Sequence, residues 1–512
     1  MSETIEIETP ETNRRLILAV LAFGVFVAAD DLTVVSTMLR QMIFDLGLSI
    51  PADLDRAAWI VNVYLIAYVG VMPFIGRLSD IIGRRRVYLS ALLLFLLGSI
   101  WVPLAHTLPA FLSGRVLTAL GGGALVPVSM AIIGDLYPRE RRAGAFGVLG
   151  AVDTAGWVWG PLYGALLIRL LSWRWQFYLN IPLSLIGLAA AWLALRRLPE
   201  PHRPIRLDWW GAGLLTGGLL ALNIALLGSG DVQTAGGFVD YQTAGRLNLP
   251  LLYALAALLL TLFLLWQRHL GSQAGNHEKA VLPLIDLRLL RRRNFAVALL
   301  LNFFIGSILI IAMVNVPLLI NILEIDVAAA ALRSGQLLSL MTGAMACLAW
   351  VGGRLTGKFH YRPITLLGLL ACALGFGLMG STWQADTSAW RMAWQLAILG
   401  VGFGLVIAPI GAAAINAAPG DQHGIASGLV IVLRLIGMSV GLSALTAWGL
   451  ERFNFLRDRL VLPPLTDAAY TQSLIQGLTQ TTVTILTETF LISAGVAGLA
   501  WLISFQLRPD AP

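Results

Sequence analysis

Long apolar segments separated by short polar ones make up most of the chain from residue 16 onward. Because the hydrocarbon core of a bilayer is about 30 Å thick, a helix needs about 20 apolar residues to cross it. Fourteen segments are long enough, and each predicts a membrane-spanning helix. They run from 16 to 38, 57 to 76, 87 to 106, 109 to 133, 143 to 168, 175 to 195, 209 to 229, 249 to 268, 294 to 321, 333 to 356, 363 to 383, 392 to 415, 426 to 449 and 484 to 506.

Composition supports this assignment. Of the 512 residues, 57% are hydrophobic and only 12% are charged, and the mean hydropathy is +0.79. A soluble globular protein carries about twice that share of charged residues. The sequence therefore predicts an all-α integral membrane protein.

Basic residues predict the orientation of the chain. An even number of helices places both termini on one side, and 23 of the 35 lysines and arginines fall on that side. By the positive-inside rule, both termini are expected in the cytoplasm. The net charge of +7 then reflects topology, and we expect no nucleic-acid partner. The acidic start, "MSETIEIETPET", is unlike a signal peptide, so the first helix is expected to remain as an anchor.

A decayed repeat suggests two similar bundles. "GRLSDIIGRRR" follows the second predicted helix from Gly76, and "GRLTGKFHYR" follows the tenth from Gly353, with His360 where Gly83 would stand. The two segments correspond if the seventh and eighth helices are an insertion. Many membrane transporters are built from two such bundles, which meet at a cavity near the middle of the bilayer. The predicted parts are a tail (1–15), an N-terminal six-helix bundle (16–196), an inserted two-helix hairpin (197–268), a linker (269–293), a C-terminal six-helix bundle (294–506) and a tail (507–512).

Two adjacent aspartates, Asp30 and Asp31, interrupt the first apolar segment in "VFVAADDLTVVS". A charge near the bilayer centre costs at least about 2.5 kcal/mol, so such residues usually face a cavity and act there. Adjacent helical residues point about 100° apart, so the two carboxylates are expected to serve different surroundings. A helical wheel places Asp30 on the polar face with Thr33 and Thr37.

At this point the sequence resembles a known family, the fourteen-helix drug:proton antiporters of the major facilitator superfamily. The matches are in order and cover nearly the whole chain. They are "DLTVVS", "WIVNVYL", "GRLSDIIGRRR", "RVLTALGGGALVP", "GWVWGPLYGA", "WRWQFYLNIP", "DLRLLRRRNF" and "GIASGLVIVLRLIG". The resemblance implies a major facilitator fold of two six-helix bundles plus two inserted helices, fourteen in total.

Five residues around the second predicted connection form a candidate conformational latch: Gly76, Asp80, Gly83, Arg84 and Asp135. Gly83 suits a turn with positive φ. The Asp80 carboxylate can cap a helix start or pair with Arg84, and Asp135 can complete a charge network. Resemblance to the family implies that this network locks one facing state. The alternative is that the arginines only anchor topology.

The fifth predicted helix carries the segment that resembles the antiporter motif. Gly156, Gly160 and Gly164 fall four residues apart and so form one stripe along which another backbone can approach. Pro161 should bend or loosen the helix there. The stripe serves either ordinary tight packing or, as the resemblance implies, a seam that seals or bends during the transport cycle.

Proton coupling requires a carboxyl group that gains and loses a proton during the cycle. Alignment to the family motif selects Asp31, whereas the helical wheel selects Asp30. We favour Asp31, because a helical wheel does not show a residue's neighbours, and keep Asp30 as the alternative. Arg115 in the fourth helix is the expected counter-ion and, by resemblance, modulates proton binding. Asp153, an acid where the family generally has a small neutral residue, is either a second proton or cation site or a buried hydrogen-bonding group.

In the second half, Asn302, Asn315 and Arg434 are the polar residues that we place near the cavity; of these, only Arg434 matches a family pattern. The sequence has no apparent group of residues that would supply a nucleophile, a general base and metal ligands. We therefore expect no enzyme activity, no metal and no cofactor.

The sequence thus predicts a proton-coupled multidrug exporter in a bacterial plasma membrane, working by alternating access as a monomer surrounded by lipid. A small amphipathic or cationic compound would exchange for protons. One alternative is export of a lipid-like or anionic metabolite. An alternative of another class is a membrane sensor on the same fold that transports nothing.

Overall fold

In the residues that the computed structural model describes, the chain forms helices joined by short turns. These residues are 11–48, 54–196, 198, 208–229, 249–273, 283–324, 327–460, 463 and 470–508. The helices are α1 (Glu11–Asp45), α2 (Leu54–Ile82), α3 (Arg84–Trp101), η1 (Val102–Leu104), α4 (Leu108–Leu136), α5 (Arg139–Leu170), α6 (Arg174–Leu195), α7 (Trp209–Ser229), α8 (Leu249–Gln273), α9 (Leu287–Leu290), α10 (Arg293–Leu323), α11 (Val327–Phe359), α12 (Tyr361–Thr382), α13 (Ala389–Ala417), η3 (Gly420–Gln422), α14 (His423–Arg457) and α15 (Tyr470–Ser504).

Thirteen of the described helices are long and apolar enough to cross a membrane. Each of the fourteen predicted segments overlaps one long helix. α5 is 32 residues long but is not among the thirteen, because its glycines, tryptophans and Asp153 lower its hydropathy. Most of the expected tail 1–15, the start of the expected hairpin at 199–207, and the centre of the expected linker at 274–282 lie outside the described residues.

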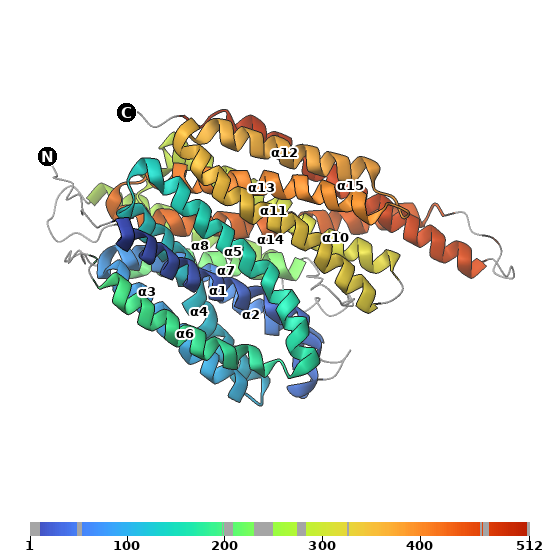
Figure 1. Cartoon of the computed structure of the whole chain (residues 1–512), viewed down its shortest axis with the longest axis horizontal. Coiled ribbons are helices and arrows are strands. Elements are labelled where there is room, and N and C mark those ends of the chain that lie inside the picture. Colours follow the sequence, from blue (N-terminus) through green and yellow to red (C-terminus); the bar gives the residue numbers. More distant parts are fainter. Residues whose placement is uncertain are drawn as a thin grey trace.

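The helices form two bundles, and both described chain ends lie at the same end of the molecule (Figure 1). In the first bundle α1 packs against α4, α5 and α6, while α4 also contacts α2 and α3. In the second, α10 packs against α13, α14 and α15, and α12 lies between α13 and α15. The bundles meet through α2 with α14, α4 with α14, and α5 with α11 and α13. Away from the termini the two bundles diverge (Figure 1).

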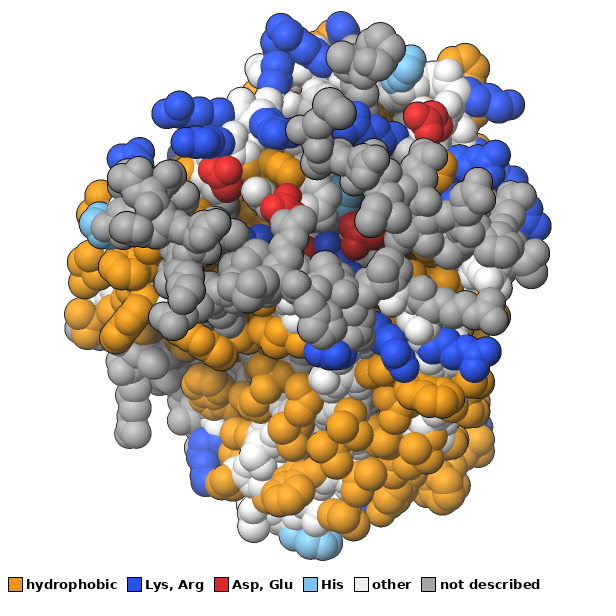
Figure 2. All heavy atoms as spheres, turned by 90° about the vertical axis from the view of Figure 1, so that its left-hand side faces the viewer, with side chains coloured by type: hydrophobic (Ala, Val, Ile, Leu, Met, Phe, Trp, Pro, Cys, Tyr) orange, Lys and Arg blue, Asp and Glu red, His pale blue; other side chains and the backbone are white. Residues whose placement is uncertain are grey.

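Basic side chains gather on the end of the molecule that carries the termini, above a broad apolar surface (Figure 2). We call this end the terminal face. Arg139 and Arg141 at the start of α5 and Arg85 and Arg86 at the start of α3 lie here. The positions match the basic connections from which the sequence predicts a cytoplasmic side.

The inserted helix α7 touches both bundles. The Thr216 hydroxyl donates to the Gly70 carbonyl of α2 (3.2 Å), and the Ser443 hydroxyl of α14 donates to the Leu226 carbonyl (2.9 Å). Asp208 holds the base of the hairpin, because its carboxylate accepts from Gly211 N (2.8 Å), Trp266 Nε1 (2.9 Å) and Gln267 Nε2 (2.7 Å). α7 therefore lies over the line where α2 meets α14, and α8 packs mainly on α7.

The last helix begins earlier than the sequence predicts. α15 starts at Tyr470 rather than 484, and α14 continues to Arg457 rather than 449. Hydropathy marks only the part of a helix that faces lipid. Beyond that part, α14 and α15 continue side by side with polar side chains between them. Arg452 of α14 donates to both carboxylate oxygens of Glu488 of α15 (2.9 and 2.8 Å), so Glu488 ties the two helices together.

The two segments of the decayed repeat form equivalent turns in the structure. Gly83 alone separates α2 from α3 and has φ 113°, which confirms the predicted positive-φ turn. His360 alone separates α11 from α12 and also has a positive φ, 63°, with ψ 179°. This region of backbone space is essentially reserved for glycine. The second bundle therefore keeps the turn of the first but with a residue that strains it.

Replacing His360 by glycine should stabilise the protein by about 1 kcal/mol, because backbone strain of this kind costs about 1–3 kcal/mol and glycine loses more entropy on folding. The measurement is the thermal unfolding midpoint of the purified protein in detergent micelles. Gly83→His is the matched reverse change and should lower the midpoint. A lower midpoint for His360→Gly would show that the histidine side chain outweighs the strain.

Candidate functional site

Asp31 forms a buried ion pair with Arg115. The Arg115 Nη1 atom donates to Asp31 Oδ2 at 2.8 Å, and the two side chains are 1% and 0% exposed. The second carboxylate oxygen accepts from Asn180 Nδ2 of α6 at 3.3 Å. Both oxygens of Asp31 are therefore occupied, and its negative charge is compensated by a guanidinium from α4.

Aromatic rings hold the Arg115 guanidinium in place. Its central carbon lies 4.1 Å from the ring centroid of Tyr64 and 5.6 Å from that of Phe177. Tyr64 also stacks on Tyr68, with centroids 5.6 Å apart. A cation over an aromatic face gains about 2 kcal/mol when it is removed from water. α2, α4 and α6 thus supply the surroundings of this pair.

Asp30 points into different surroundings, as the 100° step between helical neighbours requires. Its Oδ2 atom accepts from Gln176 Nε2 of α6 at 2.8 Å. Its Oδ1 atom is buried and has no hydrogen-bond partner, and the side chain is 6% exposed. The two neighbouring acids thus differ in kind: Asp31 is paired with a cation and Asp30 is not.

The glycine stripe of α5 packs α5 against α1 within the first bundle. A methyl group built on Gly156 would lie 2.9 Å from the Phe26 carbonyl oxygen, and one on Gly160 would lie 3.0 Å from the Asp30 carbonyl oxygen. Gly164 is buried farther along α5, and α5 continues through Pro161 without a break. The stripe therefore brings a second backbone directly against the Asp30 peptide.

Asp153 lies elsewhere, in a cavity between the two bundles. It faces Arg434 of α14 across this interface, and the two side chains attract each other electrostatically. Arg434 is also held by Asn302, whose Oδ1 accepts from Nε and Nη2 at 3.3 and 3.2 Å. Tyr68 of α2 lines the same cavity. Asp153 therefore faces the opposite bundle, and neither Asp30 nor Asp31 is among the described residues that line this cavity.

Asn315 does not lie where the sequence analysis places it. Its Nδ2 atom donates to the Thr489 hydroxyl at 2.7 Å, which joins α10 to α15 inside the second bundle. Asn315 is absent from the described residues that line the cavity. Position along a helix gave its depth in the membrane but not the neighbour it faces.

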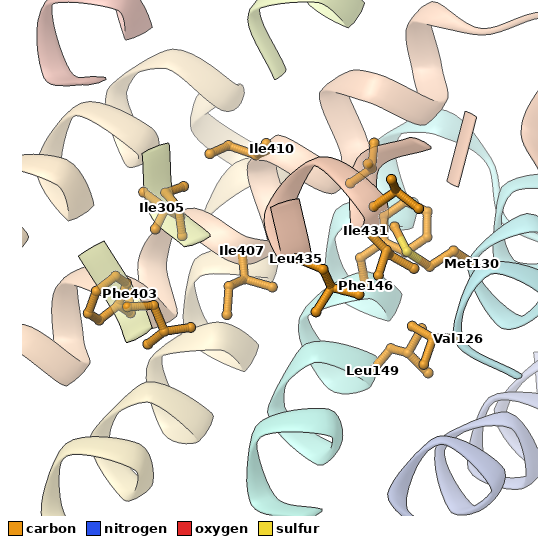
Figure 3. Close-up of a cluster of buried hydrophobic side chains, with 14 of the residues drawn as sticks. Val126, Met130, Phe146, Leu149, Ile305, Phe403, Ile407, Ile410, Ile431 and Leu435 are labelled. Carbon is orange, nitrogen blue, oxygen red and sulfur yellow. The ribbon is translucent and has the colours of Figure 1, made fainter. Parts of the chain in front are cut away.

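The rest of the cavity wall is apolar. Side chains from α4, α5, α13 and α14 meet there, as the close-up in Figure 3 shows. They are Val126, Met130, Phe146, Leu149, Ile407, Ile431 and Leu435. The indole Nε1 of Trp157 is buried in the wall without a hydrogen-bond partner. The free volume is about 50 Å³, enough for a few waters, so the cavity is nearly closed in this conformation.

A charge network joins the bundles at the terminal face. Asp80 of α2 accepts from Gly424 N (3.0 Å) and Ile425 N (3.2 Å), the first backbone groups of α14, where the helix dipole favours a negative charge. Arg84 pairs with Asp80 and with Asp135 (2.9 Å). The sequence analysis proposed these three side chains as one network, and the structure brings them together.

His423 is a member of this network that the sequence analysis did not single out. Its Nδ1 atom lies 2.8 Å from Asp135 Oδ1, so a residue of α14 completes the network on α4. Nearby, Arg142 of α5 donates to Asn416 Oδ1 of α13 at 2.8 Å. Histidine at the start of the "GIASG" segment was the available signal, but the sequence does not show which helix faces it.

Two glycine contacts bring the bundles together at the backbone level near the terminal face. A methyl group on Gly76 of α2 would lie 2.8 Å from the Gly424 carbonyl carbon of α14. A methyl group on Gly353 of α11 would lie 3.1 Å from the Gly144 Cα atom of α5. Gly76 and Gly353 are the equivalent glycines of the decayed repeat, so each bundle contributes the same kind of contact to the other.

Two helical bundles around a polar-centred cavity, closed at one end, are the architecture of a membrane transport protein. The model of the major facilitator superfamily matches residues 21–442, and the chain belongs to that superfamily. It is therefore a multi-pass membrane transporter.

Solved structures agree with this fold. The proton:xylose symporter XylE superposes with a TM-score of 0.64 at 14% identity, covering 98% of this chain and 97% of the symporter. The human organic anion transporter MFSD10 gives a TM-score of 0.61 at 15% identity, covering 97% of this chain and 100% of the other. At these identities the similarity establishes the fold alone.

Similar sequences come from mycobacteria. A triacylglyceride transporter of Mycolicibacterium hassiacum is 34% identical over 468 residues, which are 88% of this chain and 83% of the relative. A triacylglyceride transporter of Mycobacterium tuberculosis strain H37Rv is 34% identical over 469 residues, which are 88% of this chain and 86% of the relative. These relatives and the fold support a bacterial membrane protein.

Removing either member of the Asp31–Arg115 pair should destabilise the protein by about 3–5 kcal/mol, because the remaining charge is buried without a partner. The double variant Asp31→Asn/Arg115→Gln removes both charges and should recover at least half of that loss. Thermal unfolding midpoints of the three variants form the double-mutant cycle. Additive losses would mean that the two side chains are not energetically coupled.

Gly353→Ala should separate α5 from α11 at the terminal face and cost about 1–3 kcal/mol, because a methyl group has no room against Ala143 and Gly144. Gly343 on the same helix has open space around it, so Gly343→Ala is the matched control.

The readout for this pair is the distance between spin labels at Glu140→Cys and Lys358→Cys in a cysteine-free background. It should lengthen in Gly353→Ala and stay unchanged in Gly343→Ala. An unchanged distance and an unchanged melting temperature in both variants would contradict the close contact.

Proposed function

We propose that this transporter exports a lipid-like compound across the bacterial plasma membrane by alternating access, driven by protons that move inward. The observation that carries this proposal is the chemistry of the cavity between the bundles. Among the described lining residues most are apolar, Asp153 faces the basic residue Arg434, and the indole Nε1 of Trp157 is buried without a hydrogen-bond partner.

These features favour a neutral acyl compound over the cationic drug that the sequence analysis put first. A cation requires an uncompensated negative charge, but the charge of Asp153 is balanced by Arg434. An apolar wall suits acyl chains, and an ester carbonyl oxygen would satisfy the buried Trp157 Nε1 donor. The relatives named triacylglyceride transporters support the same class of substrate.

The conformation supports alternating access. With the termini in the cytoplasm, as the basic terminal face favours, the latch and the two glycine contacts close the cytoplasmic side. The bundles diverge on the other side (Figure 1), and the cavity between them is nearly closed, with a free volume of about 50 Å³. An inward-facing state requires the Asp80–α14 hydrogen bonds and the glycine contacts to separate. The latch of Gly76, Asp80, Gly83, Arg84 and Asp135 would then set the balance between the two states.

Export of a cationic drug remains the second candidate, because breaking the Asp153–Arg434 attraction in the other state would free the Asp153 carboxylate. In that case a cation and a proton would compete for it. A sensor that only binds its ligand is distinguished from both by the absence of flux.

In proteoliposomes with an imposed pH gradient, a fluorescent neutral glyceride should cross the membrane and a lipophilic cation should not release the gradient. Trp157→Phe should lower glyceride transport several-fold, because it keeps the aromatic ring but removes the donor. Gly343→Ala is the control with unchanged cavity and packing.

Three results would contradict the proposal in different ways. Gradient release by the cation alone would assign a drug antiporter. Glyceride transport that is independent of the gradient would remove proton coupling. Binding of the glyceride without flux would assign a sensor.

A further inference from the structure

Within the described part of the chain, a hydrogen-bonded carboxylate and amide each keep one buried oxygen atom that receives no hydrogen bond. They are Oδ1 of Asp30 and Oε1 of Gln176, on side chains that are 6% and 1% exposed. The two side chains are joined only through Gln176 Nε2, which donates to Asp30 Oδ2 at 2.8 Å. An unsatisfied buried acceptor costs about 1–3 kcal/mol, and more if it is charged.

Among the residues that the structure describes, no cation is paired with Asp30. On its own helix it faces Asp31, which adds a like charge; on α6 it faces the neutral Gln176; on α5 it faces the phenol of Tyr163. On α4, Arg115 directs its hydrogen bonds to Asp31. Tyr64 of α2 lies over Arg115 rather than beside Asp30.

An ionised Asp30 would therefore be a lone buried charge beside a second carboxylate. Such a group costs several kcal/mol in a low-dielectric interior, and it is neutralised by a proton or by a bound cation. Asp31 has no such requirement, because Arg115 and Asn180 occupy both of its oxygens.

We infer that Asp30 and Gln176 form the proton-binding site of this transporter, with Asp30 as the carboxyl group that takes up and releases the proton and Gln176 as its positioning residue. The inference rests on the proposed proton coupling and makes it specific. Asp31 is instead paired with Arg115 in this structure and joins α1 to α4.

The Gln176 amide suits both protonation states. Its N–H group donates to the carboxylate, as in the structure. When the amide turns over, its oxygen accepts from the O–H of the protonated acid. The proton moves between Asp30 and solvent, so no other bond forms or breaks.

The position of Asp30 explains how the proton can affect the substrate cavity. Gly156 and Gly160 pack α5 against the Phe26 and Asp30 carbonyl groups. The same helix carries Asp153 and Trp157, which line the cavity. A change of charge at Asp30 thus acts directly on the helix that contributes polar groups to the substrate site.

Infrared difference spectra of the purified full-length protein, recorded between acidic and alkaline pH, test the site without any substrate. The unmodified protein should show the carbonyl-stretch band of a buried carboxylic acid. Asp30→Asn should abolish that band, whereas Asp31→Asn/Arg115→Gln, which removes the other acid together with its counter-ion, should keep it.

Two further variants separate a proton site from a structural role. Asp30→Glu keeps a carboxyl group and should retain the band at a shifted frequency. Gln176→Leu should also shift the band frequency, because the protonated acid loses the amide acceptor, an effect that simple loss of packing would not produce.

The inference is overturned if the band survives in Asp30→Asn or disappears only when Asp31 is replaced. It is also overturned if Na⁺ at constant pH produces the same spectral change as alkaline pH, because the site would then bind a metal cation. Since no substrate is present, a band assigned to Asp30 stands even if the glyceride transport assay fails, and the proposed export would fail alone.

Discussion

The cost of placing charges away from water governs this structure. Away from water an ionised side chain needs a partner, and in the pairs described here, inside the first bundle and at the terminal face, the partners come from different helices. Asp31 on α1 is compensated by Arg115 on α4, and Arg84 on α3 is shared between Asp80 on α2 and Asp135 on α4. Because each pair joins two helices, breaking one leaves a lone charge on both.

Some of these charged contacts join helices within one bundle, whereas others join the two bundles. The Asp31–Arg115 pair lies wholly inside the first bundle, where it joins α1 to α4. The Asp153–Arg434 pair and the contacts of Asp80 with α14 cross between the bundles. Under the proposed alternating access, an interaction that crosses the interface would have to be remade in each facing state. Asp30 is the exception, because it is buried with an amide instead of a cation.

Close backbone contact between helices is the second constraint. Glycine allows it both within the first bundle and between the two bundles. Within the first bundle Gly156 and Gly160 allow α5 to lie directly on α1. Between the bundles, Gly76 with Gly424 and Gly353 with α5 allow closure at the terminal face. The antiporter-like stripe therefore packs two helices of the first bundle together, while the repeat glycines form contacts between the bundles. The inserted helix α7 covers the line between α2 and α14 and is hydrogen-bonded to each.

The sequence by itself determined the elements that depend on local chemistry. Runs of about 20 apolar residues specify where helices cross the membrane, the basic connections mark one face, and Gly83 marks the turn with positive φ. Repetition at Gly76 and Gly353 predicted two related bundles. The sequence also identified the acids and bases that lie inside helices, because a charge in an apolar run stands out whatever it faces.

Only the tertiary structure decided which neighbour each of these side chains has. A helical wheel gives direction but not the helix that lies there, so it could not show that Arg115 and Asn180 surround Asp31 while Gln176 alone serves Asp30. For the same reason Asn315 was misplaced, His423 was missed, and the polar start of α15 was not recognised as a helix. Partners such as Asp135 and His423 are 288 residues apart in the chain, and such pairs are set by how the bundles pack.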